Sequence, residues 1–204
     1  MADLLIGQVG TTGVGDGSSR SARGGRYGAQ AVMQSHASNF DAVDRGNMFM
    51  CSMQAAAALG TGLTATAVTF TLHNPSGSGK NLVVVQTTLA VVVGTTAGFV
   101  VYAVNDTPAQ AAPATTTALT IRNCNLGAGS ASVARVFSVA TLPAAPVATR
   151  VLAGIISTTP GGVHSIVDMV NGGIILPENT SVTIQGITTN ATGVISMMWE
   201  ECSP

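Results

Sequence analysis

Charged residues are scarce in this chain. Lysine, arginine, aspartate and glutamate make up 17 of the 204 residues, and eight of these lie within the first 45. The remaining 159 residues hold nine charges, about 6%, against roughly 25% in an ordinary soluble domain. Because charged side chains keep protein surfaces apart, a free monomer so poor in charge would be poorly soluble. We therefore expect much of the surface to be covered, which indicates a subunit of an assembly before any enzyme.

Basic residues, aromatic residues and cysteines are also few. The single lysine, Lys80, and a net charge of −1 give no clustered basic surface for nucleic acid, so we expect no nucleic-acid partner. The only tryptophan, Trp199, is more typical of a core than of a sugar-binding platform. The three cysteines are odd in number and far apart, which argues against a disulfide framework and a Cys-x-x-Cys zinc site. We expect reduced thiols at Cys51, Cys124 and Cys202.

One uncharged run is long enough to cross a bilayer as a helix, namely residues 81–105. Its apolar residues are mostly valine, which favours strands, and polar residues such as Gln86 interrupt it. The turn-like sequence at 94–98 divides it into two strands, 82–93 and 99–105, which we expect to form a hairpin. The short apolar stretch after Asp3 does not resemble a signal peptide. The sequence therefore predicts no membrane partner and no targeting segment.

From residue 46 onward the pattern is one short strand after another, separated by Gly, Pro and Asn turns. Eight to ten such strands are expected, including 48–57, 64–74, 181–188 and 194–200, with no convincing helix among them. This spacing predicts an all-β fold, an antiparallel β-sandwich that is jelly-roll-like, with an extended N-terminal arm. We assign residues 1–45 to the arm and residues 46–204 to the β-sandwich domain.

The residue patterns of several expected strands also predict which of their faces are buried. In 64–74 the alternation places Phe70 and Leu72 on one face and His73 on the opposite polar face, which predicts His73 at the surface. Strand 82–93 is apolar on both faces, with Leu82, Val84, Ala90 and Val92 on one and Val83, Val85, Leu89, Val91 and Val93 on the other. Strand 99–104 repeats this pattern. An overlying loop, the arm or another subunit could cover the second face, and we favour another subunit.

Motifs that could carry chemistry are weak. The loop 76–80 lacks the first glycine of a phosphate-binding loop, and a strand rather than a helix is expected after it. The three histidines are isolated from any partner at metal-ligand spacing. Glu200 and Glu201 are adjacent, so on a strand they point to opposite faces and do not form an acid/base pair. We expect no catalytic, cofactor-binding or metal-binding residues and a protein that is not an enzyme, with a β-sandwich hydrolase as a remote alternative.

The arm has its own composition, with eight glycines and three arginines at three-residue spacing. Glycine and serine at this density disfavour both helix and packed strand, so we interpret residues 1–45 as an extended segment that orders on a partner. A leader without a role is the alternative. Arginine suits bidentate pairing with carboxylates, which favours a protein partner. The candidate contacts are Arg20, Arg23, Arg26 and Tyr27.

Parts of the chain resemble small structural proteins of tailed bacteriophages. The resemblance lies in residues 74–82 with the valine-rich strand after them, in 175–182 and 196–201, and in 25–29 leading to 45–49. It implies a virion component with a β-sandwich body, a homo-oligomer that is most often a trimer, bound to the major capsid protein at the capsid surface. The arm favours a capsid cement (decoration) protein, because an extended segment can lie across shell subunits. A tail or head fibre or receptor-binding module is the alternative.

Overall fold

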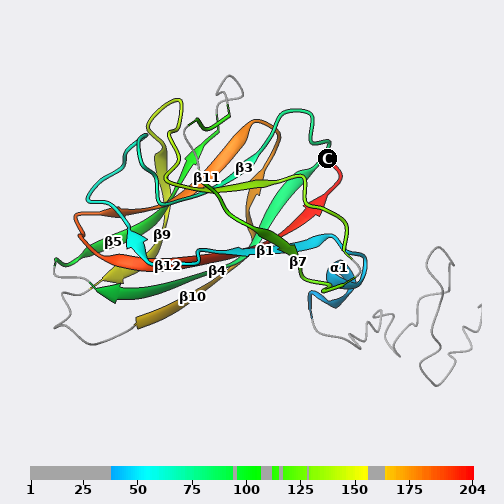
Figure 1. Cartoon of the computed structure of the whole chain (residues 1–204), viewed down its shortest axis with the longest axis horizontal. Coiled ribbons are helices and arrows are strands. Elements are labelled where there is room, and N and C mark those ends of the chain that lie inside the picture. The colour runs from blue at the N-terminus through cyan, green and yellow to red at the C-terminus, as the bar shows by residue number, and fades with distance from the viewer. Residues whose placement is uncertain (1–37, 94–95, 107–111, 115–116, 128, 156–163) are drawn as a thin grey trace, which may run out of the picture. The chain divides into compact units, whose positions relative to one another are not determined.

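The computed structural model describes residues 38–93, 96–106, 112–114, 117–127, 129–155 and 164–204 (Figure 1). The candidate arm contacts Arg20, Arg23, Arg26 and Tyr27 lie outside these residues. The chain divides into two units, Met1–Phe40 and Asp41–Pro204. No helix among the described residues is long and apolar enough to cross a membrane.

The described part of the chain is almost entirely β-structure, organised in two antiparallel sheets. Its elements are α1 (Phe40–Asp44), β1 (Met48–Ser52), β2 (Ala57–Ala58), β3 (Phe70–Asn74), β4 (Asn81–Val93), β5 (Gly98–Asn105), β6 (Thr117–Ala118), β7 (Ile121–Asn123), β8 (Arg135–Ser138), β9 (Val147–Ile155), β10 (His164–Leu176), β11 (Thr180–Ile187) and β12 (Thr192–Cys202). The first sheet has the order β10-β4-β12-β1-β7, with β2 paired to β12. The second sheet has the order β6-β8-β3-β11-β5-β9.

The chain passes back and forth between these sheets. Four strands of the first sheet, β10-β4-β12-β1, face four of the second, β3-β11-β5-β9, and most successive strands belong to different sheets (Figure 1). This alternation is the jelly-roll arrangement, so the predicted antiparallel β-sandwich is confirmed. The predicted hairpin of 82–93 with 99–105 is wrong, because β4 pairs with β10 and β12 whereas β5 pairs with β9 and β11. The chain therefore passes from the first sheet to the second between β4 and β5.

An insertion between β5 and β9 extends both sheets on one side. Within it, β7 pairs with β1 at the edge of the first sheet, and β8 pairs with β3 in the second sheet, with β6 beyond it. Both edges that β1 and β3 would otherwise expose are therefore covered by the chain itself. The remaining edges of the eight-stranded framework are β9 and β10.

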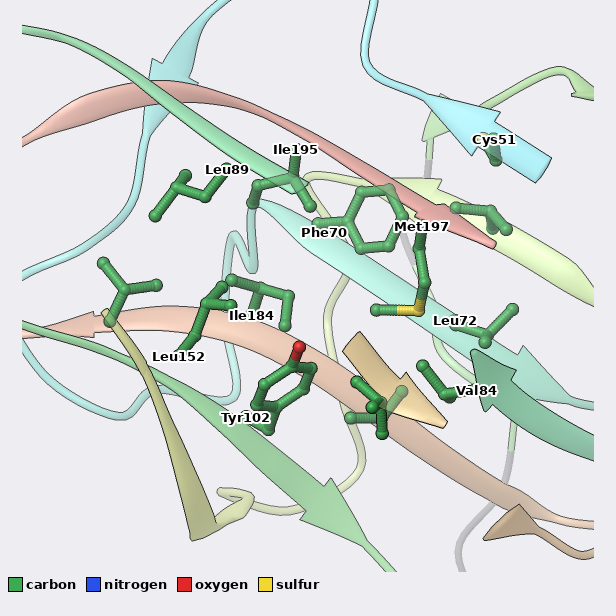
Figure 2. Close-up of a cluster of buried hydrophobic side chains, with 14 of the residues drawn as sticks. Cys51, Phe70, Leu72, Val84, Leu89, Tyr102, Leu152, Ile184, Ile195 and Met197 are labelled. Atoms are coloured by element: carbon green, nitrogen blue, oxygen red, sulfur yellow. The ribbon is translucent and has the colours of Figure 1, made fainter. Parts of the chain in front are cut away.

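The core fills the space between the inner faces of the sheets (Figure 2). Along β12 the side chains alternate regularly between buried and partly exposed, as a strand with one face in the core requires. Trp199 is fully buried, as predicted, and stacks on Phe49 of β1 with ring centroids 6.3 Å apart. Removing such aromatic side chains from water contributes about 25 cal/mol per Å² of apolar area, so the core is the main stabilising element.

Much of the outward face of the second sheet, on β3, β5 and β11, is also buried. Gln185 of β11 accepts a hydrogen bond from the backbone N–H of Thr64 (2.9 Å) and donates one to its carbonyl (3.1 Å). Asn105 of β5 donates to the carbonyl of Ala144 (3.0 Å). The segments before β3 and after β8 thus lie across this face as a covering layer, which we define as residues 59–68 and 139–146.

This covering layer overturns one prediction and answers another. His73 is only 2% exposed, so its predicted surface position is wrong: alternation separates the two faces of a strand but does not show whether the outer face is covered. On β5, the outward-facing Val101 and Ala103 are 3% and 0% exposed. For these residues the chain itself supplies the second buried face, where we had favoured another subunit.

Candidate interaction face

Several outward-facing apolar side chains of the first sheet are exposed, and we call this side of the sheet the outer face. On the edge strand β10, Val167, Met169 and Ile175 are 55%, 48% and 54% exposed. The strand registers place successive rows across the sheet, and one row runs from β7 to β10 through Arg122, Met50, Met198, Gln86 and Met169. The next row contains Ser52, Ser196, Thr88 and Val167. The rows thus combine exposed apolar side chains with uncharged polar ones, a mixture that suits an interaction site.

A β-bulge in β4 determines which residues belong to this face. Gln86 lies opposite Met198 and Val84 lies opposite Trp199, so Val85 has no partner in the register and is buried. Beyond the bulge the alternation is reset, and Leu89 and Val91 point into the core with Leu82 and Val84. The predicted division of 82–93 into two faces is therefore wrong, because it assumed one unbroken alternation. Val83, Ala90 and Val92 are the apolar residues of β4 on the outer face.

Only two charged side chains stand on the outer face among the described strand residues. They are Arg122 of β7, which is exposed, and Glu200 of β12, which is partly exposed. Neither forms an ion pair with another described residue. Burial and the neighbouring Glu200 carboxylate raise the pKa of the Cys202 thiol, while Lys80 opposes this effect.

A groove of about 540 Å³ hollows the outer face next to the insertion. The described residues that line it carry thioether, hydroxyl and amide groups with one thiol and one guanidinium: Met50, Cys51, Ser52, Gln54, Gln86, Thr88, Thr120, Arg122, Ser196, Met197 and Met198. None of these described lining residues is a carboxylate or a histidine, so they provide no acid/base pair of the usual kind. It suits contact with an uncharged or weakly anionic surface.

The described ion pair of the sandwich lies on its other open side, between β9 and β10. Arg150 contacts Asp168 at 2.7 Å, and Tyr102 donates a hydrogen bond to the other carboxylate oxygen at 3.0 Å. Burial, with a smaller contribution from Asp168, raises the pKa of Tyr102 well above its usual range. Because both oxygens of Asp168 are occupied, this cluster ties β5, β9 and β10 together rather than presenting a reactive group. Sequence spacing gave no sign of it, since the three residues lie far apart in the chain.

The two adjacent glutamates at the end of β12 have different surroundings, as predicted from their alternation. Glu201 points inward and is 5% exposed. Its carboxylate accepts hydrogen bonds from the hydroxyl of Ser132 (2.5 Å) and the backbone N–H groups of Val133 (3.1 Å) and Ala134 (3.3 Å). These bonds fix the insertion to β12, which gives Glu201 a structural role.

The glycine-rich loop before β4 is also occupied by a carboxylate of the chain. Glu178 accepts hydrogen bonds from the backbone N–H groups of Gly77 (2.9 Å) and Gly79 (2.7 Å), and these bonds lower its pKa. The loop leads into strand β4, as predicted, and not into a helix that could hold phosphate. The loop therefore serves as a tie to the β10–β11 connection.

Metal-binding and thiol chemistry find little support in the described residues. No group of three or more His, Cys, Asp or Glu side chains in this part of the chain is placed to hold a metal ion. The three cysteines are free, as predicted, and burial raises the pKa of the Cys51 thiol to about 11. A thiol with so high a pKa is a poor nucleophile at neutral pH.

Comparison with known proteins adds no relative, since no family model matches the chain and no curated protein or solved structure is significantly similar to it. The function is therefore inferred from the outer face and from the arm sequence.

Proposed function

We propose that the protein is a non-enzymatic structural subunit of a bacteriophage virion, and that it acts as a capsid cement protein. The observation that carries this proposal is the outer face of the first sheet, which exposes apolar side chains among uncharged polar ones and has two charged side chains on its described strands. A sheet face exposing Val167, Met169 and Ile175 favours a partner, because large contiguous apolar patches on soluble proteins mark interaction sites.

The energetics agree with this role. Fully burying a valine, isoleucine or methionine side chain stabilises a contact by about 1.5–3 kcal/mol before ordering costs are subtracted. A rigid sandwich loses little conformational freedom when it binds, so most of that gain is retained in the assembly. A face of this kind can strengthen a shell at many equivalent positions.

The arm supplies the proposed anchor to the shell. Arg20, Arg23 and Arg26 would pair with carboxylates of the major capsid protein, with Tyr27 packing beside them. An extended arm buries a large area from few residues, which suits attachment across neighbouring capsid subunits. This part of the proposal is based on the sequence.

A tail or fibre receptor-binding module is the second candidate, and the groove is the observation in its favour. Its amide, hydroxyl and guanidinium groups, with Gln86, Thr88 and Arg122 among them, could hydrogen-bond a glycan. None of the described residues that line the groove is aromatic, which makes this candidate weaker because sugar sites commonly use stacking.

Immunogold electron microscopy of purified particles tests the two candidates directly. We expect label over the whole capsid surface, whereas label confined to the tail would favour receptor binding. Purified capsids lacking the protein should bind the full chain in sedimentation assays, and the combined R20A, R23A and R26A substitutions should weaken that binding. Absence of the protein from particles would contradict the virion role.

A further inference from the structure

We propose that a second copy of this chain packs on the outer face of the first sheet, related to the first by a two-fold axis. This inference deepens the proposed function, since it names the partner of the face that the assembly role requires. It concerns a contact between copies, whereas the cement role concerns attachment to the capsid.

The outer face is suited to sheet-on-sheet packing. Two sheets pack face to face about 10 Å apart when the facing side chains are mostly apolar and interdigitate. The central strands β4 and β12 present Val83, Ala90, Val194 and Met198, and the edge strand β10 adds Val167 and Ile175. Methionine is flexible and fills irregular gaps, so Met50 and Met198 can adapt to an opposing copy of the same surface.

The two charges of the face point to a second copy as the occupant. Met50 lies opposite both Arg122 and Met198, and Glu200 follows Met198 by two residues on β12. Strand spacing and residue rise therefore separate Arg122 from Glu200 by about 12 Å, too far for a direct pair. An acidic partner would satisfy only Arg122, and a basic partner only Glu200. A second copy satisfies both, because a two-fold operation that brings Arg122 over Glu200 also brings Glu200 over Arg122.

The same operation places the methionines where the surface has room for them. The two-fold axis that achieves this pairing lies between the two packed sheets and parallel to them. It passes midway between Arg122 and Glu200 and close to Met50. Met50 and Met198 therefore each lie near the same residue of the second copy. The groove of about 540 Å³ borders both side chains and can receive methionine side chains from the second copy. Its polar lining then lies at the contact and can form hydrogen bonds across it.

The edge of the first sheet is a poorer place for a second copy. Edge pairing through β10 would require a regular strand, but the register shifts between Met169 and Ile174. Asn171 and Gly172 there have φ values of 49° and 81°, which interrupt the ladder. Asp168 points inward on the same strand, a further feature that discourages edge-to-edge pairing. The face, and not the edge, is the surface open to a copy.

A pair of matched valine substitutions tests the location of the contact. Val167 on β10 belongs to the outer face and is 55% exposed, while Val147 on β9 is 65% exposed and belongs to the second sheet. We expect sedimentation equilibrium of the full chain to show a dimer, and V167E to raise its dissociation constant about a hundredfold. V147E should leave the constant unchanged. Equal effects of both substitutions, or none from V167E, would overturn the proposal.

A charge exchange tests the two-fold geometry. R122E and E200R should each raise the dissociation constant, because each places like charges opposite one another twice in the dimer. The double variant R122E/E200R restores opposite charges and should recover most of the wild-type affinity. The two-fold contact would be overturned if the double variant did not recover the wild-type affinity. It would also be overturned if the wild-type chain stayed monomeric at high concentration or formed the trimer implied by the phage resemblance. None of these results changes where the protein lies on the particle, so the cement role is tested separately.

Discussion

At the residue scale, the buried carboxylate of Glu201 connects the insertion to the core sandwich. We predict that Glu201→Gln lowers the free energy of unfolding by about 1–3 kcal/mol, because the amide keeps the volume but replaces charge-assisted hydrogen bonds from Ser132, Val133 and Ala134 with weaker ones. Urea unfolding of the full chain measures the effect. Asp106→Asn at an exposed carboxylate is the control and should be neutral. Equal stability of both variants would show that the charge of Glu201 is dispensable.

His73 makes a second residue-scale prediction, which concerns pH. Its pKa is lowered from 6.5, chiefly by burial; the nearby Arg135 also lowers it, and a backbone hydrogen bond at Thr180 opposes the shift. The unfolded chain therefore binds the proton first as pH falls. The stability that neutral His73 confers is complete above pH 6.5 and is lost as pH decreases from there toward the lower folded-state pKa.

Unfolding measurements between pH 7.5 and pH 5 should show this loss in the wild-type protein. The contribution of His73 cannot exceed about 1.4 kcal/mol per pH unit, the value for one proton. His73→Gln removes the titrating group, so the difference in slope between the two proteins isolates His73 from carboxylates and from the exposed His164. If stability depended on pH with the same slope in both proteins, the pKa of His73 would be the same in the folded and unfolded states.

At the element scale, the sequence predicted strands better than their connections. Alternation identified β11 and β12 and the opposite faces of Glu200 and Glu201, because each strand has one face in the core. It assigned a hairpin to β4 and β5, since a short glycine turn looks the same whether the chain returns to its sheet or crosses to the other. Long-range packing makes that choice, and local sequence does not record it.

For the candidate site, too, local sequence predicted part of the structure but not the long-range packing. The sequence indicated that β4 carried too many apolar residues for one buried face, which is how an interaction face could be expected at all. It could not place the bulge at Val85, which selects Ala90 and Val92 for the surface and Leu89 and Val91 for the core. It also missed the cover over His73, because alternation assigned residues 64–74 to one strand, whereas β3 begins at Phe70 and the residues before it belong to the covering layer.

The covering layer yields a prediction about glycine. A Cβ on Gly186 of β11 would lie 2.5 Å from the carbonyl oxygen of Gly60 in the covering layer, and the N–H of Gly186 donates to the carbonyl of Leu59. Gly186→Ala must therefore displace backbone and should lower the free energy of unfolding by about 1–3 kcal/mol. Gly154→Ala on β9 meets nothing within 4 Å and should be neutral or slightly stabilising. Thermal or urea unfolding of the two variants compares them, and equal stabilities would contradict a close fit of the layer.

At the scale of the whole molecule, the scarcity of charge has two different explanations on the two sheets. The second sheet hides much of its outward face on β3, β5 and β11 beneath residues of its own chain, although Phe99 and Val151 remain 55% and 59% exposed there. Among the described residues, no such layer covers Val167, Met169 and Ile175 of the first sheet, and Arg122 and Glu200 are the charged residues of its strands on that face. The outward face of the first sheet is therefore one surface that a partner would cover, and the exposed Phe99 and Val151 mark further apolar surface on the second sheet.

The last prediction separates the body from the arm. Removal of residues 1–37 should leave the sandwich folded, because the chain from Asp41 onward is bonded to the rest of the body: Gly46 accepts hydrogen bonds from Asn123 and Ser130, and the N–H of Glu201 donates to Asn47. We expect one cooperative thermal transition in circular dichroism, within about 4 °C of the full chain. If the arm is the capsid anchor, the truncated protein should no longer sediment with capsids, although its dimer persists. Undiminished capsid binding would contradict the arm's role, and loss of the cooperative transition would show that the arm is part of the folded body.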